Sequence, residues 1–258
     1  MGSLYGEDMI RAVKAYDGYH EGANNWTIFS NILDECNYYA PQKKQNQPWC
    51  ATYINFSALQ AAIPEDRDNE AKKYDAQYFL FQPSYNNLSC SVKYMAQYFR
   101  DAGAWYEEPE LADVVFFNQV DENGNIIDYD VHVGLVTDLG KYITTEEGNA
   151  GDMVQEKYYD FSDIGVKIHG FGRPRYDGFK NPANVSHKPV EEKPEDPTTG
   201  FDVGTVKVSD FLAIRKGPGV EHEKVGELYD GATVTILEKY SNWARIGSGI
   251  WVCSDYLK

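Results

Sequence analysis

The sequence predicts an α+β domain followed by a small all-β domain. Three observations lead to this prediction. Helical periodicity dominates the first hundred residues, short apolar strand-like runs follow from residue 112, and a proline-rich segment separates both from a further set of short strands. Helices first and antiparallel strands after are typical of the α+β class.

Four segments of the first part have helical patterns. Residues around 7–17 and 26–36 gather apolar side chains on one face. A third helix begins at Cys50, just after Pro48, and stops before Pro64, because helices tolerate proline in the first turn and rarely continue through it later. Residues 90–103 form the fourth, with Gly103 as its stop.

Short strands are expected from residue 113 to residue 176. The turn DENGN at 121–125 joins the first two as a hairpin, which accounts for its acidic residues without a calcium ion. The other predicted strands lie in the runs KYITTEEGN, MVQEKYYDF and KIHGFGRPRY.

The predicted boundaries are 1–176 for the first domain, 177–202 for a linker and 203–258 for the all-β domain. The linker contains four prolines and almost no apolar residues, so it cannot bury enough surface to fold and favours an extended spacer. The insertion at 64–88 is interpreted as a surface loop or as a lining of the substrate groove.

The charge distribution excludes some partners. The chain has a net charge of −16, and residues 1–176 hold 27 acids against 14 bases. Such an acidic body argues against nucleic acid, which calls for a basic face. No apolar run reaches the ~18–20 residues of a membrane span. The N-terminal residues lack the basic start and apolar core of a secretory signal peptide.

Cys50 is the most informative candidate for chemistry. Unpaired N–H groups and the helix dipole at a helix N-terminus favour a thiolate over a thiol. Cys36, Cys90 and Cys253 have no metal-ligand spacing, so no metal or other cofactor is expected. A bridge between Cys36 and Cys90 stays open, although small buried hydrophobes are the favoured interpretation.

His132 is the best candidate base. It lies in the run DVHVGLV, where alternation places it with Gly134 on the face opposite Val133 and Leu135. The other histidines are weaker candidates: His169 lies near two arginines, and His20, His187 and His222 lie outside the predicted core structure.

Glu147 and Asn149 follow the next strand-like run. Either can accept a hydrogen bond from one imidazole nitrogen and so direct the other nitrogen toward the thiol. Gln47 and the backbone N–H of Cys50 are the expected oxyanion donors. Cysteine, histidine, then an acid or amide, in this order, is an arrangement used by papain-like thiol hydrolases.

The motifs QPWCATYINF, ADVVFF, VHVGLV, TTEEGNAG and HGFGRPRY together resemble a CHAP domain, the papain-like cysteine, histidine-dependent amidohydrolase/peptidase family, over roughly residues 5–176. The resemblance is to versions found in endolysins and prophages of Gram-positive gut bacteria. It implies a nucleophile at Cys50, a base at His132, and further polar positions at Glu147 and Asn149. The chain departs from the family at 111–113, where Leu-Ala-Asp replaces Pro-Gly-Asp.

The C-terminal segment is similar to a bacterial SH3-like domain, because it has an LxIRxGPG-type opening and the closing WVxxxYL. Such modules commonly bind cell-wall peptides, which makes the aromatic side chains Trp243, Trp251, Tyr229 and Tyr240 candidates for a wall-binding surface.

Together the two resemblances imply a peptidoglycan amidase or endopeptidase that acts as a monomer at the bacterial cell wall, without nucleic acid or membrane partners. It would be either a phage lysin released through a holin or a secreted protein whose signal was trimmed. An inactive wall-binding protein and a papain-like protease acting on proteins are the alternatives.

Overall fold

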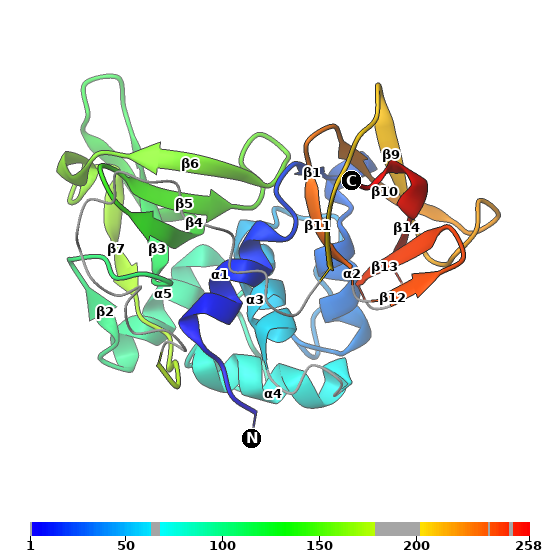
Figure 1. The fold of residues 1–258 in the computed structure, drawn as a ribbon. Coiled ribbons are helices and arrows are strands. Elements are labelled where there is room, and N and C mark those ends of the chain that lie inside the picture. Colours follow the sequence, from blue (N-terminus) through cyan, green and yellow to red (C-terminus); the bar gives the residue numbers. More distant parts are fainter. Residues whose placement is uncertain (1, 63–67, 179–201, 237, 248–249) are drawn as a thin grey trace.

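The structure is a computed structural model that describes residues 2–62, 68–178, 202–236, 238–247 and 250–258. Most of the predicted linker, residues 179–201, lies outside the described residues, as do residues 63–67 of the insertion. The chain forms helices packed on an antiparallel sheet, followed by a small β domain, so the predicted α+β class is confirmed. Figure 1 shows the sheet of the first domain and the C-terminal β domain on either side of helices α1 and α3.

The helices match the predicted positions and add one more. The α-helices are α1 (Gly6–Lys14), α2 (Ile28–Glu35), α3 (Cys50–Ala61), α4 (Asn69–Phe79) and α5 (Val92–Asp101), with a short 3₁₀ turn η1 (Ala23–Asn25) before α2. Helix α4 corrects the interpretation of the insertion as a surface loop. Asp68 caps it by accepting from the Ala71 N–H, and α4 packs on α3.

Six strands form the sheet of the first domain. Its order is β2-β7-β3-β4-β5-β6. The bounds are β2 (Trp105–Tyr106), β3 (Val114–Val120), β4 (Ile126–Leu139), β5 (Ile143–Glu147), β6 (Gln155–Tyr159) and β7 (Ile168–Gly172), with the 3₁₀ turn η2 (Phe161–Asp163) before β7. The predicted hairpin between β3 and β4 is present, and the Asp121 carboxylate accepts from the backbone N–H groups of Asn123 and Asn125.

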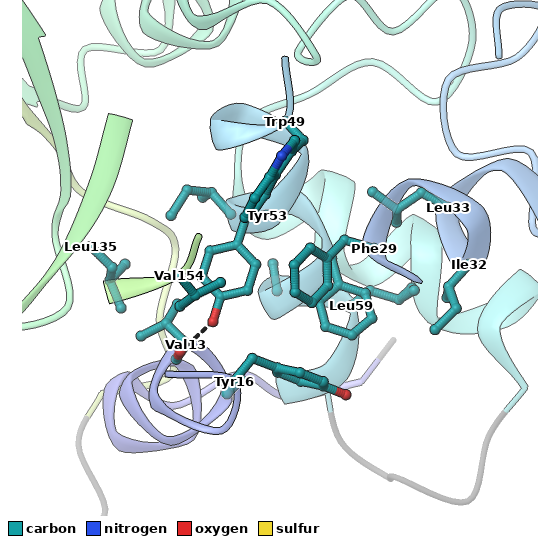
Figure 2. Packing of buried hydrophobic residues seen from close by; sticks show 14 of the residues in the cluster. Val13, Tyr16, Phe29, Ile32, Leu33, Trp49, Tyr53, Leu59, Leu135 and Val154 are labelled. Carbon is teal, nitrogen blue, oxygen red and sulfur yellow. Dashed lines mark hydrogen bonds between the residues drawn. The ribbon is translucent and has the colours of Figure 1, made fainter. Parts of the chain in front are cut away.

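The central helix α3 is buried along most of its length. Its buried residues cover all sides of the helix, as expected for a helix enclosed by other elements. Phe29 of α2 contacts the rings of Trp49 and Tyr53 at centroid distances of 5.4 and 4.7 Å. The Tyr53 hydroxyl donates to the carbonyl of Val13 in α1 (Figure 2). These contacts fix the N-terminus of α3 against α1 and α2.

The C-terminal domain is built from short strands: β8 (Asp202–Thr205), β9 (Phe211–Arg215), β10 (Lys224–Tyr229), β11 (Thr233–Ile236), β12 (Glu238–Tyr240), β13 (Trp243–Gly247) and β14 (Ile250–Cys253), followed by the 3₁₀ turn η4 (Ser254–Tyr256). Strands β8 and β11 pair with each other. The other five, with strand β1 (Tyr19–His20) of the first domain, form a sheet of order β1-β10-β9-β14-β13-β12.

The first strand of that sheet comes from the other domain. Strand β1 (Tyr19–His20) pairs with β10, with Tyr19 opposite Leu228 and His20 opposite Glu227. The Tyr16 hydroxyl donates to the Ile246 carbonyl at 2.8 Å in a buried contact. Buried residues of both domains form one continuous hydrophobic cluster. The C-terminal domain is therefore docked on the α1–β1 segment, which the prediction of two tethered modules did not anticipate.

Candidate active site

Helix α3 begins at Cys50, as the sequence predicts. Its N-cap residue, Trp49, makes no side-chain capping hydrogen bond. The N–H groups of a first helical turn have no partner within the helix, so they and the dipole favour a negative charge at this end. Cys50 is 7% exposed. The structure thus places the buried Cys50 side chain at the uncapped N-terminus of α3.

His132 lies on β4 beside this helix end. Its Nε2 atom is 2.8 Å from Oε2 of Glu147, and its ring also has a hydrogen-bonding contact with the Cys50 side chain. A carboxylate can only accept, so Nε2 carries the proton of this pair and Nδ1 is the nitrogen that remains for another partner. The His132 side chain is 25% exposed, which leaves the ring accessible from solvent.

Glu147, at the end of β5, is held by three partners. Besides His132, the Thr145 hydroxyl donates to its Oε1 at 2.6 Å and the Tyr159 hydroxyl donates to the same oxygen at 2.9 Å. The Glu147 side chain is 2% exposed. A buried carboxylate needs such donors, because an unpaired charge in the interior is costly. The Phe117 ring lies between Tyr159 and His132, at centroid distances of 4.8 and 5.7 Å.

Two glycines provide the clearance for this arrangement. A Cβ atom at Gly134 would lie 2.7 Å from Cγ of Glu147. One at Gly148 would lie 2.6 Å from Cβ of Tyr53 and 2.8 Å from the Trp49 ring. Gly134 therefore lets the Glu147 side chain cross β4, and Gly148 lets the end of β5 approach the start of α3.

The surroundings of His132 change its acidity. Burial lowers its pKa, but hydrogen bonds and charge interactions with Cys50 and Glu147 outweigh burial and raise the pKa to about 10. The physical cause is the placement of the imidazole between the Cys50 sulfur and the Glu147 carboxylate, which favours its protonated form. At neutral pH His132 therefore holds its proton.

The other predicted polar positions are not joined to His132. Asn149 lies two residues after Glu147 in a left-handed backbone conformation, with φ of 59°. Nε2 of His132 donates to Glu147 instead. Gln47 is exposed in the bend before Trp49, three residues from Cys50. An oxyanion role for Gln47 stays a prediction.

The remaining histidines lie elsewhere. His169 shares Asp130 with Arg100, at 2.8 Å from the carboxylate, and its ring packs against Trp105. His20 is in β1 and packs against the Tyr229 ring at 4.5 Å, so the expectation that it lies outside regular structure is wrong. His222 lies in the C-terminal domain beside Glu221. His187 is outside the described residues.

The described residues include four free cysteines and no disulfide. The Cys36 thiol contacts the carbonyl of Leu33, and the Cys90 thiol that of Leu88. Within the described ranges, no group of three or more His, Cys, Asp or Glu side chains could hold a metal ion. In the same ranges, no helix has the length and apolar character needed to cross a membrane.

The four aromatic candidates for wall binding differ in exposure. Trp243 is 8% exposed and lies in the core of the C-terminal domain, so its ring is not available at the surface. Trp251 is half-buried. Tyr229 faces His20, and Tyr240 is 62% exposed. Of the four, only Tyr240 presents most of its ring to solvent.

The contacts of Thr145 and Tyr159 with Glu147 were not predicted from the sequence. Thr145 stands two residues before Glu147 on the same strand, so alternation places both on one face and could have identified it. Tyr159 belongs to β6 and reaches Glu147 only through the β5–β6 pairing. Its role depends on a register that the sequence does not specify.

Comparisons with known proteins identify the C-terminal domain. Residues 210–258 match the family model described as Bacterial SH3 domain. No curated protein sequence matches the chain.

Among solved structures, "The crystal structure of Ly7917 with the hydrolyzing product of MDP" is 17% identical, covers 96% of this chain and 92% of its own, and has a TM-score of 0.41. "The crystal structure of Ly7917" is 17% identical, covers 97% and 92%, and has a TM-score of 0.40. The family match and the strand arrangement agree that the chain ends in an SH3-like β domain.

Proposed function

We propose that this chain is a peptidoglycan hydrolase that cleaves an amide bond, with Cys50 as nucleophile and His132 as base. The observation that carries the proposal is the continuous line of contacts from Cys50 through His132 to Glu147 at the start of α3. A nucleophile, a base within reach, and a third group that orients the base are the parts that thiol hydrolysis needs.

The reaction follows from these positions. The Cys50 thiolate attacks the carbonyl carbon of the amide, and the oxygen takes up the negative charge. The backbone N–H of Cys50 and the Gln47 side chain serve as its donors. The imidazolium of His132 then protonates the leaving amine, the C–N bond breaks, and an acyl-enzyme remains. His132 next takes a proton from water, the hydroxide attacks the acyl carbon, and the acid product leaves with regeneration of the thiolate.

Glu147 acts through His132. Its hydrogen bond to Nε2 fixes the ring orientation, and its charge stabilises the imidazolium formed in each half of the reaction. The hydroxyls of Thr145 and Tyr159 hold the carboxylate in place. Asn149 would be a further polar residue of the site, as the resemblance to CHAP domains implies.

The cell wall is the proposed substrate because a bacterial SH3 domain is joined to the candidate site. Modules of this kind commonly bind cell-wall peptides, and the CHAP resemblance implies hydrolysis of peptidoglycan. The bond is either that between muramic acid and the first alanine or one within the stem or cross-bridge. Trp251, Tyr229 and Tyr240 remain the proposed wall-contacting residues.

The test is mass spectrometry of purified Gram-positive peptidoglycan after digestion by wild type, Cys50→Ala and Cys90→Ala. Cys90 is a second partly buried thiol away from His132, so its variant controls for the loss of a thiol. We expect wild type and Cys90→Ala to release fragments and Cys50→Ala to release less than about a hundredth as much. Peptides freed from sugar identify an amidase, and shortened stems still on sugar identify an endopeptidase.

Three outcomes would contradict the proposal. Equal release by Cys50→Ala would exclude the cysteine mechanism. No release by wild type on walls of several cross-bridge types would favour an inactive wall-binding protein, and cleavage of an unrelated protein substrate under the same conditions would favour a protease.

A further inference from the structure

A groove lies between the two domains, beside the strand pairing of β1 and β10. Its volume is about 490 Å³. One wall comes from the first domain and includes Glu21, Gly22 and Trp26. The other wall is the stretch 223–227 of the C-terminal domain. Neither domain forms this groove alone.

The charged side chains of the second wall already have partners of opposite charge. Glu223 pairs with Lys216 at 3.1 Å. Glu227 pairs with Lys224, whose ammonium group also lies 3.9 Å from the centroid of the Phe211 ring. These pairs leave this wall close to neutral.

Glu21, on the first wall, is different. Its Oε2 accepts from Nε1 of Trp49 at 2.5 Å. The Asn25 amide, oriented with its nitrogen toward the carboxylate, donates to both oxygens at 3.1 Å. Both partners are neutral. Among the described residues, no lysine or arginine forms an ion pair with Glu21, so the groove contains one carboxylate charge without a counter-ion.

The same residue connects the groove to the candidate active site. Trp49 immediately precedes Cys50 and is itself fully buried. The backbone N–H of Glu21 also donates to the carbonyl of Asp152, in the loop that follows Glu147. A ligand held at Glu21 would therefore lie next to the elements that position both the nucleophile and the group that orients its base.

We propose that this groove binds the part of the peptidoglycan peptide that has a free amino group, with Glu21 as the counter-ion of its ammonium. This inference rests on the proposed function, because the peptide bound here would be part of the same substrate. An ammonium group supplies the missing positive charge, and hydrogen bonds between charged groups are about twice as strong as neutral ones. The partly buried ring of Trp26 provides apolar surface for the methylene groups of the peptide.

The test uses binding, not turnover. Muropeptides with a free side-chain amine, and the same muropeptides after acetylation of that amine, are titrated calorimetrically into full-length Cys50→Ala protein. We expect the free-amine form to bind at least about tenfold more tightly. Adding Glu21→Gln should reduce that ratio to near one, because the amide still accepts from Trp49 but has no charge. Glu122→Gln, an exposed change in the β3–β4 turn, should keep the ratio.

Equal affinity of the free and acetylated forms for Cys50→Ala would overturn the proposal. So would a Glu21→Gln variant that keeps the full preference, or an absence of measurable binding by either form. Because these measurements use inactive protein, a clear preference with no hydrolysis by wild type would reject the proposed function and keep the binding site. Hydrolysis by wild type without a binding preference for the free amine would keep the proposed function and reject the binding site.

Discussion

Glu146 and Glu147 are neighbours on β5 and point to opposite faces of the sheet. Glu147 lies on the face of His132 and accepts from three side chains. Glu146 pairs across the sheet with Leu135 and is fully buried. Neither of its carboxyl oxygens has a hydrogen-bond partner among the residues described. One face of this strand contributes to the polar candidate site, and the other packs into the hydrophobic core.

The two residues show the two ways in which a protein accommodates a buried acid. Donors surround the Glu147 carboxylate and can stabilise its charge. Glu146 has no donors, and burial, followed by the nearby charge of Asp17, raises its pKa to about 9. Glu146 is therefore an uncharged acid at neutral pH. Identical substitutions at the two positions should have effects of different kinds.

The largest expected effect is on activity in Glu147→Gln. Loss of the charge beside His132 should lower kcat/KM by about 10²–10⁴-fold, the usual contribution of general acid–base catalysis. Glu146→Gln is the matched control, because it makes the same change one residue away on the opposite face. It should keep kcat/KM within about threefold of wild type. Equal losses in the two variants would contradict the assignment of Glu147 to the site.

The pH profile of the same variant gives a second readout. The imidazolium of His132 loses its proton as the pH rises through its pKa of about 10, so wild-type kcat/KM should fall in that range. Without the Glu147 charge that pKa is lower, and the alkaline limb should move to lower pH. If the alkaline limb of Glu147→Gln lay at the same pH as that of wild type, Glu147 would not act through His132.

A smaller loss of activity is expected from Gly134→Ala. The added Cβ would meet Cγ of Glu147 at 2.7 Å and the Glu146 carbonyl at 3.1 Å, so the Glu147 side chain must shift. A misplacement of about 1 Å can cost roughly 10²-fold in rate, and we expect a loss of about 10–100-fold in kcat. Gly124→Ala is the control for the steric contact: at a φ of 82° and in open space in the β3–β4 turn, it strains the backbone without meeting a side chain. A Gly134→Ala enzyme as active as Gly124→Ala would show that this clearance is unnecessary.

Glu146→Gln should instead change how stability depends on pH. The native state holds a proton on Glu146 up to a pKa of about 9, whereas the unfolded chain releases it near the ordinary value of 4.5. The contribution of Glu146 to stability therefore falls as pH rises through this window. The glutamine amide of the variant cannot titrate, so between pH 5 and pH 8 the variant should gain up to about 4 kcal/mol relative to wild type.

This difference is measured as Tm at both pH values. It corresponds to about 2–4 °C for each kcal/mol in a chain of this size. Glu122→Gln, at an exposed position, controls for the loss of a surface carboxylate. Parallel Tm curves for wild type and Glu146→Gln would exclude a buried, protonated Glu146.

Local sequence patterns predicted part of this arrangement. The start of α3 at Cys50 and the alternation around His132 are local signals, and they predicted both positions correctly within the fold. Alternation in the run 143–147 distinguishes the faces of Glu146 and Glu147, but it does not say which face holds the helices. That depends on the packing of α1 and α3, which is a tertiary property.

The docking of the C-terminal domain could not be predicted from the sequence, for a similar reason. Strand β1 has two residues, too few for a periodic pattern, and it exists because β10 provides a pairing edge. Gly18, with φ of 79°, allows the turn that brings Ala232 within 3.1 Å of a Cβ position there. Only the assembled fold reveals a contact of this kind, and the groove at Glu21 depends on it.

The smallest expected effect is in Tyr159→Phe. The variant loses one of the two hydroxyls that donate to Oε1 of Glu147 but keeps the ring contact with Phe117. With one donor fewer, the carboxylate attracts the imidazolium proton more strongly. The alkaline limb should then move slightly to higher pH, opposite to Glu147→Gln, while kcat/KM falls by about 2–10-fold.

The control for Tyr159→Phe is Tyr158→Phe. The neighbouring Tyr158 is 62% exposed, and its hydroxyl donates to Glu156 instead. Its removal should leave both kcat/KM and the pH profile unchanged. A shift of the alkaline limb to lower pH in Tyr159→Phe, as in Glu147→Gln, would contradict this role. It would mean that the Tyr159 hydroxyl stabilises the protonated ring of His132 directly and does not act through the Glu147 carboxylate.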